Sequence, residues 1–344
     1  MHSQNLRMSL YSQRKLAILS GTIFCSLFTL FCFIASLLFG ETTITIDALI
    51  DATIHYSSHD QVHSFLVEER LPRAVTALVV GASLAISGVL LQTLVKSPLA
   101  SPSLISVNSG ALVFSVIAVS VLTITLLEQV VMLASIGAVL ALAAVYLLDH
   151  SSRSLTQPVK TLFSGLVLTV LALSITALLL ITTNGSWDDI VFWLAGSVSQ
   201  HSIKTVVPLL PLLVFAIGVT WLLTPYLNQL MENDTMDKPL GYSTTIIRLL
   251  IAICIAIFAS ISVVMAGFIG FVGLMIPYLI RKFAKPDFKW LLPISALLGA
   301  SLLLAIDTAS RYLSPAHTIP IGVGTALIGV PFVGYLIWRS RQKQ

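Results

Sequence analysis

The amino-acid sequence predicts an all-α membrane protein, a polytopic bundle of about ten transmembrane helices forming one domain over residues 1–344. Hydrophobic residues make up 56% of the chain and charged residues 10%, against roughly 25% charged in soluble proteins. The apolar runs are also nearly continuous, as at 249–265, whereas membrane β-strands alternate apolar and polar residues. Helices satisfy their own backbone hydrogen bonds in lipid, so helical spans are predicted.

The spans follow from apolar runs near the ~20 residues that cross a bilayer. The first run follows basic residues as a signal peptide would, but it exceeds the usual ~7–15 apolar residues of one, so an uncleaved span is predicted. The segment 187–198 is predicted as a short helix at a membrane face. The spans are expected at 16–39, 74–95, 104–127, 129–148, 161–183, 206–226, 245–266, 268–280, 291–310 and 320–338.

Basic residues are distributed unequally between the predicted loops. With the N-terminus inside, 15 of the 19 Lys and Arg residues fall on the inner side, as the positive-inside rule requires. The outer four are Arg70, Arg73, Lys204 and Arg311. Both termini are therefore predicted to be cytoplasmic, with lipid around the spans. Because the basic residues stand at span ends, they do not form a nucleic-acid-binding patch.

The predicted outer loop, residues 40–69, contains His55, His59 and His63. Their i, i+4, i+8 spacing places them on one helix face, which is compatible with a metal site. A wetted amphipathic segment explains the same spacing, and no Cys or fixed carboxylate completes a ligand set. No metal or cofactor is therefore assigned. Cys25, Cys32 and Cys254 lie in apolar runs and are expected to act as small hydrophobic residues.

No catalytic or ATP-binding motif is evident. Gly322-Val323-Gly324 opens a membrane span rather than following a strand, and no P-loop sequence occurs. Ion-coupled carriers usually place ionisable residues near the membrane midplane, but Glu128, Asp149 and Asp307 fall near predicted span ends. The energy for transport is thus expected from a separate ATPase. Two rival hypotheses are an ion-coupled secondary transporter and a sensor scaffold, and the short segment after Arg339 leaves no signalling domain for the latter.

The largest inner connection, residues 227–243, mixes apolar and charged residues and ends on Leu240-Gly241, as a helix ends at a glycine cap. A short amphipathic helix here would give a motor subunit a surface to grip, while a plain solvated loop is the alternative. Small residues along the second span, including Ser83, Ser87 and Gly88, allow close helix approach.

Three ordered blocks resemble a known family. The first runs from Arg70-Leu71-Pro72-Arg73 through 81–92 to Ser97-Pro98-Leu99-Ala100-Ser101-Pro102, the second covers 266–278, and the third runs from 291–293 through Asp307 and Arg311 to 319–322 and 329–332. Together they closely resemble the iron-siderophore and vitamin B12 ABC importer permeases of the FecCD type.

The resemblance implies a dimer around a central pathway in a bacterial cytoplasmic membrane, with two cytoplasmic ATP-binding subunits and a periplasmic or lipoprotein substrate-binding protein. Both a homodimer and a heterodimer with a related permease fit. The predicted cargo is a ferric siderophore, with cobalamin or haem as alternatives. Where the family tends to have Leu-Gly-Glu, this chain has Met231-Glu232-Asn233, and Pro239 precedes Leu240. The inner helix is therefore expected to be shorter or differently ended.

The resemblance also assigns roles to individual residues. Arg70, Arg73 and Arg311 are expected to meet acidic residues of the binding protein. The ATPase-coupling residues are expected to be Leu227, Asn228, Leu230, Leu240 and Gly241. The residues themselves, apart from the resemblance, suggest the pathway and gate positions, with simple helix packing an equal alternative for the small residues of the second span. These positions are Ser83, Ser87, Gln92, Gly267, Gly270, Gly273 and Pro277, the last four because they interrupt the stretch at 268–280.

Overall fold

The computed structural model describes residues 2–40, 44–54, 60–150, 157–183, 186–198, 206–232, 244–283, 287–314 and 319–341, which contain helices and no strand. The elements are α1 (His2–Leu38), α2 (Ile46–Ile54), α3 (Gln61–Phe65), η1 (Leu66–Arg70), α4 (Leu71–Val95), α5 (Val107–Val116), η2 (Ile117–Val121), α6 (Leu127–His150), α7 (Gln157–Thr182), α8 (Trp187–Ala195), η3 (Val207–Leu209), α10 (Leu210–Leu222), α11 (Thr224–Glu232), α12 (Thr244–Ala266), α13 (Val272–Phe283), α14 (Phe288–Leu313) and α15 (Ile321–Arg341).

Each predicted span has a helical counterpart, so the predicted all-α bundle is confirmed. Within the described residues, six helices are long and apolar enough to cross a membrane, and the pair α10 and α11, bent by 51°, makes a seventh. The segments Val107–Val121 and Ile321–Leu336 are shorter apolar helices. Helix α13 has 12 residues. At 1.5 Å per residue it is too short to cross alone.

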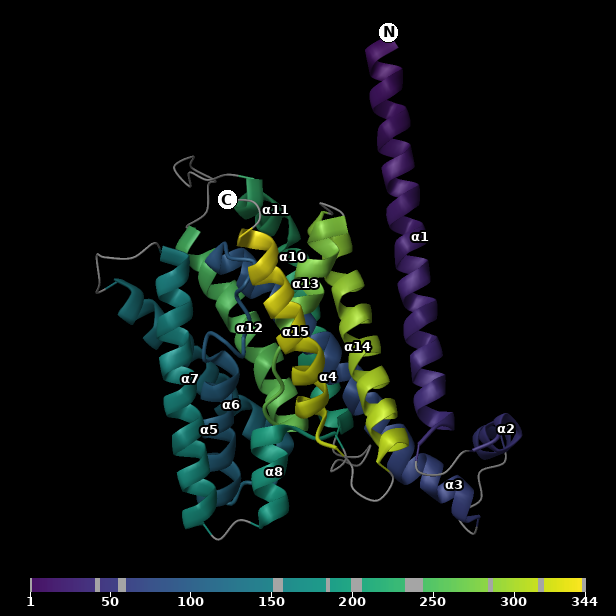
Figure 1. Cartoon of the computed structure of the whole chain (residues 1–344), viewed down its shortest axis with the longest axis vertical. Helices are drawn as coiled ribbons and strands as arrows, with labels where there is room; N and C mark the ends of the chain where they lie inside the picture. Colours follow the sequence, from purple (N-terminus) through teal and green to yellow (C-terminus); the bar gives the residue numbers. More distant parts are fainter. Residues whose placement is uncertain are drawn as a thin grey trace.

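Helix α4 occupies the middle of the protein. It packs against α14, α12 and α13, while α1 packs on the outside of α14, and Figure 1 shows α1 at the edge of the bundle. In the most apolar window of α4, 83% of the residues are buried, against 28% for α1 and 22% for α7. The side chains that α1, α6 and α7 expose are mostly large and apolar, as a lipid-facing surface requires.

The two ends of the bundle carry different elements. Both chain ends and α11 lie toward one end, whereas α3, α8 and the last turn of α14 lie toward the other (Figure 1). A short helix is present near 187–198 as expected: α8 begins with a capping box between Ser186 and Asp189. Its expected position at a membrane face is wrong, because its axis runs along the bundle (Figure 1) and Phe192 and Trp193 are buried in the core.

Candidate functional site

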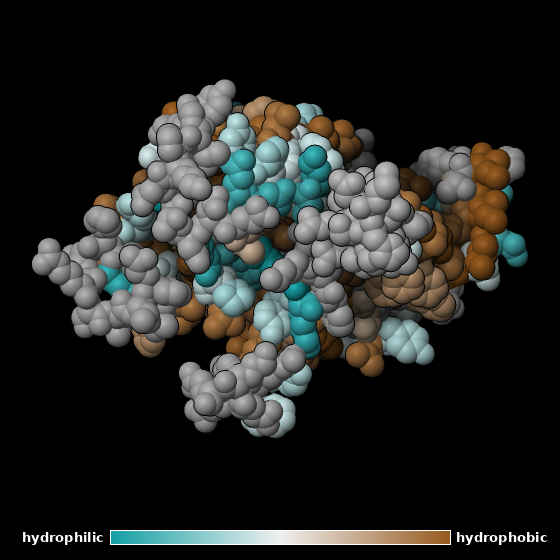
Figure 2. All heavy atoms as spheres, turned by 90° about the horizontal axis from the view of Figure 1, so that it is seen from above, coloured by the Kyte–Doolittle hydropathy of each residue, from teal (hydrophilic) through white to brown (hydrophobic). Residues whose placement is uncertain are grey.

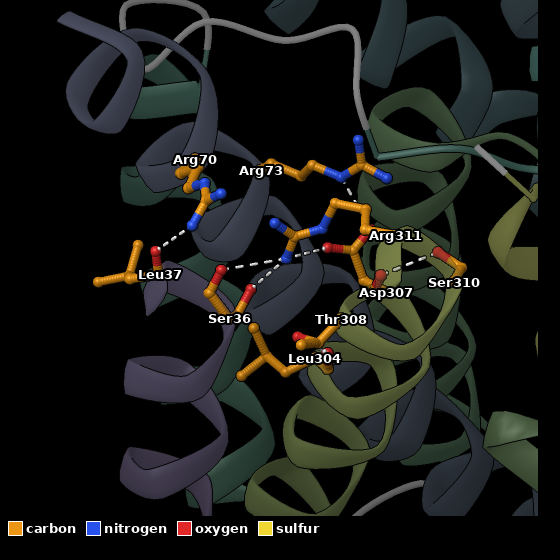
Figure 3. Close-up of polar contacts among 9 residues, drawn as sticks. All are labelled: Ser36, Leu37, Arg70, Arg73, Leu304, Asp307, Thr308, Ser310 and Arg311. Carbon is orange, nitrogen blue, oxygen red and sulfur yellow. Dashed lines mark hydrogen bonds and ion pairs between the residues drawn. The ribbon is translucent and has the colours of Figure 1, made fainter. Parts of the chain in front are cut away.

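Three arginines and one aspartate meet where α4, α14 and the end of α1 come together (Figure 3). Arg73, in the first turn of α4, donates from Nε to Asp307 Oδ1 at 2.8 Å. Arg311, one turn after Asp307 on α14, places Nη2 2.9 Å from Asp307 Oδ2. Arg70 completes what we term the arginine cluster. A single buried carboxylate therefore pairs with guanidinium groups from two helices.

Two of these arginines also bind the end of α1. Arg311 Nη2 donates to the carbonyl oxygen and the hydroxyl of Ser36, at 3.1 and 2.9 Å, and Arg70 Nη1 donates to the Leu37 carbonyl at 2.6 Å. The last carbonyls of a helix lack partners within the helix and carry partial negative charge. The two cations thus stabilise the C-terminus of α1. A Cβ added at Gly40 would lie 3.0 Å from Arg311 Nη1, so a larger residue would crowd this arrangement.

The cluster is largely shielded from solvent within the chain. Arg70 is 3% exposed, Arg311 4% and Asp307 0%, while the Arg73 side chain is 13% exposed. The guanidinium groups are instead used inside the chain, where they bind Asp307 and the end of α1. Whether these arginines also meet a binding protein stays a prediction. Figure 3 shows the terminal nitrogens of Arg73 directed away from Asp307.

At the other end of the bundle, α11 provides the described part of the predicted coupling segment. Leu227 is 0% exposed. The Asn228 amide donates to Asp287 Oδ1, and its oxygen accepts the backbone N–H of Phe288 at 3.1 Å. Leu230 is partly buried against the core. Asn228 thus ties α11 to the first turn of α14, while Leu240 and Gly241 lie outside the described residues. The coupling role of these five positions stays a prediction.

Arg281, near the end of α13, was not selected by the sequence interpretation. Its Nη2 donates to Thr93 Oγ1 at 2.9 Å on α4, and its Nη1 lies 3.5 Å from Met231 Sδ on α11. The guanidinium carbon stands 5.7 Å from the centre of the Phe288 ring on α14, within the range of a cation–π contact. One side chain therefore contacts α4, α11 and α14. No local sequence pattern distinguishes it from its neighbour Lys282.

The break between α12 and α13, residues 267–271, is fixed by contacts with the end of α8. Gly267 has φ +70°, and a Cβ there would lie 2.1 Å from the Phe192 carbonyl oxygen, so only glycine fits without movement. Phe268 donates its backbone N–H to the Trp193 carbonyl at 3.0 Å. Such external partners are the condition under which irregular backbone is tolerated at membrane depth.

The other residues predicted for the gate differ in their surroundings. Around Gly270 there is room for a Cβ, the nearest atom being Ser103 Oγ at 3.7 Å. A Cβ at Gly273 would lie 2.8 Å from the Leu84 carbonyl oxygen. Pro277 lies inside α13. Gly273 is thus a packing contact in this conformation, and a gate or hinge role for the segment stays a prediction.

The polar residues predicted for the pathway lie inside the chain. Ser83 and Ser87 are 0% exposed and Gln92 is 1% exposed. The Gln92 amide donates to the carbonyls of Pro98 and Leu274, at 3.0 and 3.2 Å. These contacts join α4 to α13 and to the turn after α4 that contains Pro98. In this conformation the three residues pack helices together, and a place on a pathway wall stays a prediction.

The histidine segment is described only in part. His55 and His59 lie outside the described residues. His63 is 4% exposed, with Nε2 3.5 Å from Asp51 Oδ2 and 3.9 Å from Asp60 Oδ2. In the part of the chain that the structure describes, no group of three His, Cys, Asp or Glu residues is arranged to hold a metal. His63 instead connects α2 to the start of α3.

The comparisons with known proteins agree on one family of transport permeases. The model of the FecCD transport family matches residues 28–339. The chain is 33% identical over 306 residues to YfiZ of Bacillus subtilis, named a probable siderophore transport system permease protein. This match covers 89% of this chain and 92% of YfiZ. It is 35% identical over 272 residues to the Fe(3+) dicitrate transport system permease protein FecC of Escherichia coli, covering 78% and 82% of the two chains.

A solved structure described as a metal-chelate type ABC transporter in an inward-facing conformation has the same fold. It superposes with a TM-score of 0.75 at 29% identity, over 92% of this chain and 98% of its own. The apolar spans define a multi-pass membrane protein, and the matching relatives are named as transport permeases. The chain belongs to the FecCD transport family, because the family model covers nearly all of it.

Proposed function

We propose that the chain is the permease subunit of an ATP-driven importer that moves an iron chelate, with a ferric siderophore or ferric citrate as cargo. The observation that carries the proposal is the family match over residues 28–339, together with relatives named for siderophore, Fe(3+)-citrate and Fe(3+) dicitrate transport. Two copies, or this chain and a related permease, would form the pathway. Cobalamin and haem are the alternative cargoes.

The charge arrangement supports a pump driven by a partner over an ion-coupled carrier. Ion-coupled carriers usually place their coupling carboxylates near the membrane midplane. The carboxylate of Asp307 lies near the C-terminal end of α14, fully buried in ion pairs with Arg73 and Arg311. Glu128 is exposed at the start of α6. Neither carboxylate occupies the middle of a span, so ATP hydrolysis by separate cytoplasmic subunits is the proposed energy source.

The arginine cluster supports docking of an acidic partner at the outer end. Its three cations exceed its one carboxylate, and such an excess attracts anionic groups. Arg73 is the most exposed of the three, so we assign it the first contact with a carboxylate of the binding protein. That carboxylate would compete with Asp307 for Arg73, which weakens the α4–α14 connection on docking. Arg70 and Arg311 would act chiefly by holding the end of α1.

At the inner end, α11 supports contact with the ATPase subunits. Asn228 connects it to the first residues of α14, so a push on α11 would reach α14 directly. In this proposal both termini are cytoplasmic and the arginine cluster faces outward, in agreement with the basic residues of the inner loops.

The test is reconstitution of the permease with its ATPase and binding protein in proteoliposomes. Uptake of ⁵⁵Fe-labelled ferric citrate or ferric siderophore should require ATP inside and the binding protein outside. A non-hydrolysable ATP analogue and omission of the binding protein provide the controls. Uptake driven by an ion gradient without ATPase subunits would overturn the proposal. Uptake of labelled cobalamin or haem in place of iron chelates would change the cargo but not the class.

A further inference from the structure

Helix α2 differs in direction from the membrane spans. It comprises nine residues, Ile46–Ile54, and Figure 1 shows it end-on while α1 and α14 run close to the vertical. It lies beside the C-terminal end of α1 in the same view. The axis of α2 is therefore roughly perpendicular to the spans. A helix in this direction at the end of a span lies in the plane of the membrane surface.

The side chains of α2 divide into three groups. Leu49 and Ala52 face the protein, Leu49 packed against the core and Ala52 only 5% exposed. Ile46, Ile50 and Ile54, spaced by four residues, are 62%, 50% and 68% exposed, and residues at this spacing share one helix face. We call these three side chains the isoleucine stripe. Next to the stripe, Asp47 and Asp51 are also exposed.

The apolar side of α2 faces the membrane layer that the spans cross. Figure 2 looks down on the bundle from the end that carries the termini, and α2 forms the right-hand edge in that view. A strongly apolar band runs along this edge and is visible from above. The apolar part of α1, Leu19–Leu38, lies on the same side of α2. The exposed isoleucines thus point toward the layer that α1 crosses.

We propose that α2 lies in the outer interface of the membrane, with the isoleucine stripe in the acyl-chain region of the lipid. An apolar face beside charged residues is the usual composition of interfacial helices. The inference uses only the orientation of the proposed function and does not depend on the cargo. It assigns a lipid-binding surface to the segment that the sequence interpretation treated as an outer loop.

The direction of the stripe favours lipid over a protein occupant. A binding protein approaches from outside and meets the opposite side of α2. A second copy of the chain would have to reach the same layer beside α1, where the exposed side chains of α1 are themselves large and apolar. Continuity with that lipid-facing surface makes acyl chains the fitting occupant.

The proposed position of α2 in the membrane interface has a structural consequence for the arginine cluster. Asp51 on α2 contacts His63 of α3 at 3.5 Å, and α3 continues through η1 to Arg70. The depth of α2 in the interface therefore helps to fix where α3 and η1 lie.

The test is depth measurement in lipid on the full chain. Ile50→Cys and Ile54→Cys would each be labelled with a small environment-sensitive fluorophore, with the exposed Asp51→Cys, about 100° around the helix from the middle of the stripe, as the control on the same helix. The native thiols of Cys25, Cys32 and Cys254 are buried, so the unsubstituted protein measures background labelling. Proteoliposomes would contain lipids with a nitroxide quencher on the acyl chain. Two stripe variants keep the test informative if one does not fold.

We expect labels at positions 50 and 54 to lose most of their fluorescence to the acyl-chain quencher and to emit at shorter wavelength than the label at 51. Equal quenching of all three labels by aqueous iodide would overturn the proposal, because it places the stripe in water. Protection from both quenchers would also overturn it. Energy transfer between labelled copies would then identify a second chain as the occupant, and protection only with the binding protein present would identify that protein.

Discussion

The interaction of Asp307 with two arginines gives the sharpest prediction. Asp307→Asn keeps the shape of the side chain and removes its charge. The substitution leaves Arg73 without its ion pair at 2.8 Å and Arg311 without its ion pair at 2.9 Å. Arg311 retains the two oxygens of Ser36. The C-terminus of α1 therefore remains bound, while the ion pair between Arg73 of α4 and residue 307 of α14 is lost.

The size of the effect follows from burial. Removing one member of a buried ion pair costs about 3–5 kcal/mol, because the remaining charge is left uncompensated. Part of Arg73 reaches solvent and Arg311 keeps other acceptors, so we expect the lower end, about 3 kcal/mol. At about 2 °C per kcal/mol for a large domain, the melting temperature should fall by about 6 °C.

The native cysteines provide the assay. Cys25, Cys32 and Cys254 are 8%, 6% and 2% exposed, so a thiol-reactive dye reports unfolding of detergent-solubilised protein. Thr308→Ala is the matched control, since Thr308 adjoins Asp307 but, among the described residues, its side chain bonds only to the Leu304 carbonyl. A melting temperature for Asp307→Asn equal to that of Thr308→Ala would refute the reasoning. Combining Asp307→Asn with Arg73→Gln should cost less than the sum of the single changes, because contacting residues are not additive.

Three further substitutions test packing and coupling. Gly88→Ala places a Cβ 1.9 Å from a carbonyl oxygen of α13 and should destabilise the protein by about 1–3 kcal/mol or more; Gly218→Ala, with no atom within 4 Å, should leave the melting curve unchanged. Asn228→Ala should lower iron uptake per ATP hydrolysed while the subunits still copurify, and unchanged stoichiometry would argue against coupling through α14. Arg281→Met keeps the bulk but loses the hydrogen bond to Thr93, so the same uptake ratio should fall, whereas Lys282→Met should not alter it.

Features that depend on local periodicity were predictable from the sequence. The run of apolar residues in 74–95 fixes a span whether or not its neighbours are known, and α4 covers it. The pairing of Asp307 with Arg311 also has a local signal, because i, i+4 residues share a helix face. The bond from Arg73 to Asp307 has no such signal, since 234 residues separate them.

The burial of charged groups was not predictable for the same reason. A positive charge at a predicted span end normally indicates a solvent-exposed side chain, and Lys96 is exposed. Arg70 and Arg311 instead turn inward, because the end of α1 offers carbonyl oxygens. Only the tertiary arrangement brings those acceptors near. Likewise, the segment 40–69 has enough charge to resemble a loop, and the isoleucine spacing in α2 becomes meaningful only once its direction relative to α1 is known.

Helix α14 connects the two candidate sites and explains why they can influence one another. Its first turn, at Asp287 and Phe288, binds Asn228 of α11, and its last turns carry Asp307 and Arg311. Its 26 residues span about 39 Å at 1.5 Å per residue, which exceeds the ~30 Å hydrocarbon core. Because it also packs along α4 with glycine-to-glycine contact at Gly81 and Gly299, the two helices have little freedom to slide separately. A displacement of α11 should therefore reach the arginine cluster as movement of α14, and release of Arg73 from Asp307 should loosen the same helix from its other end.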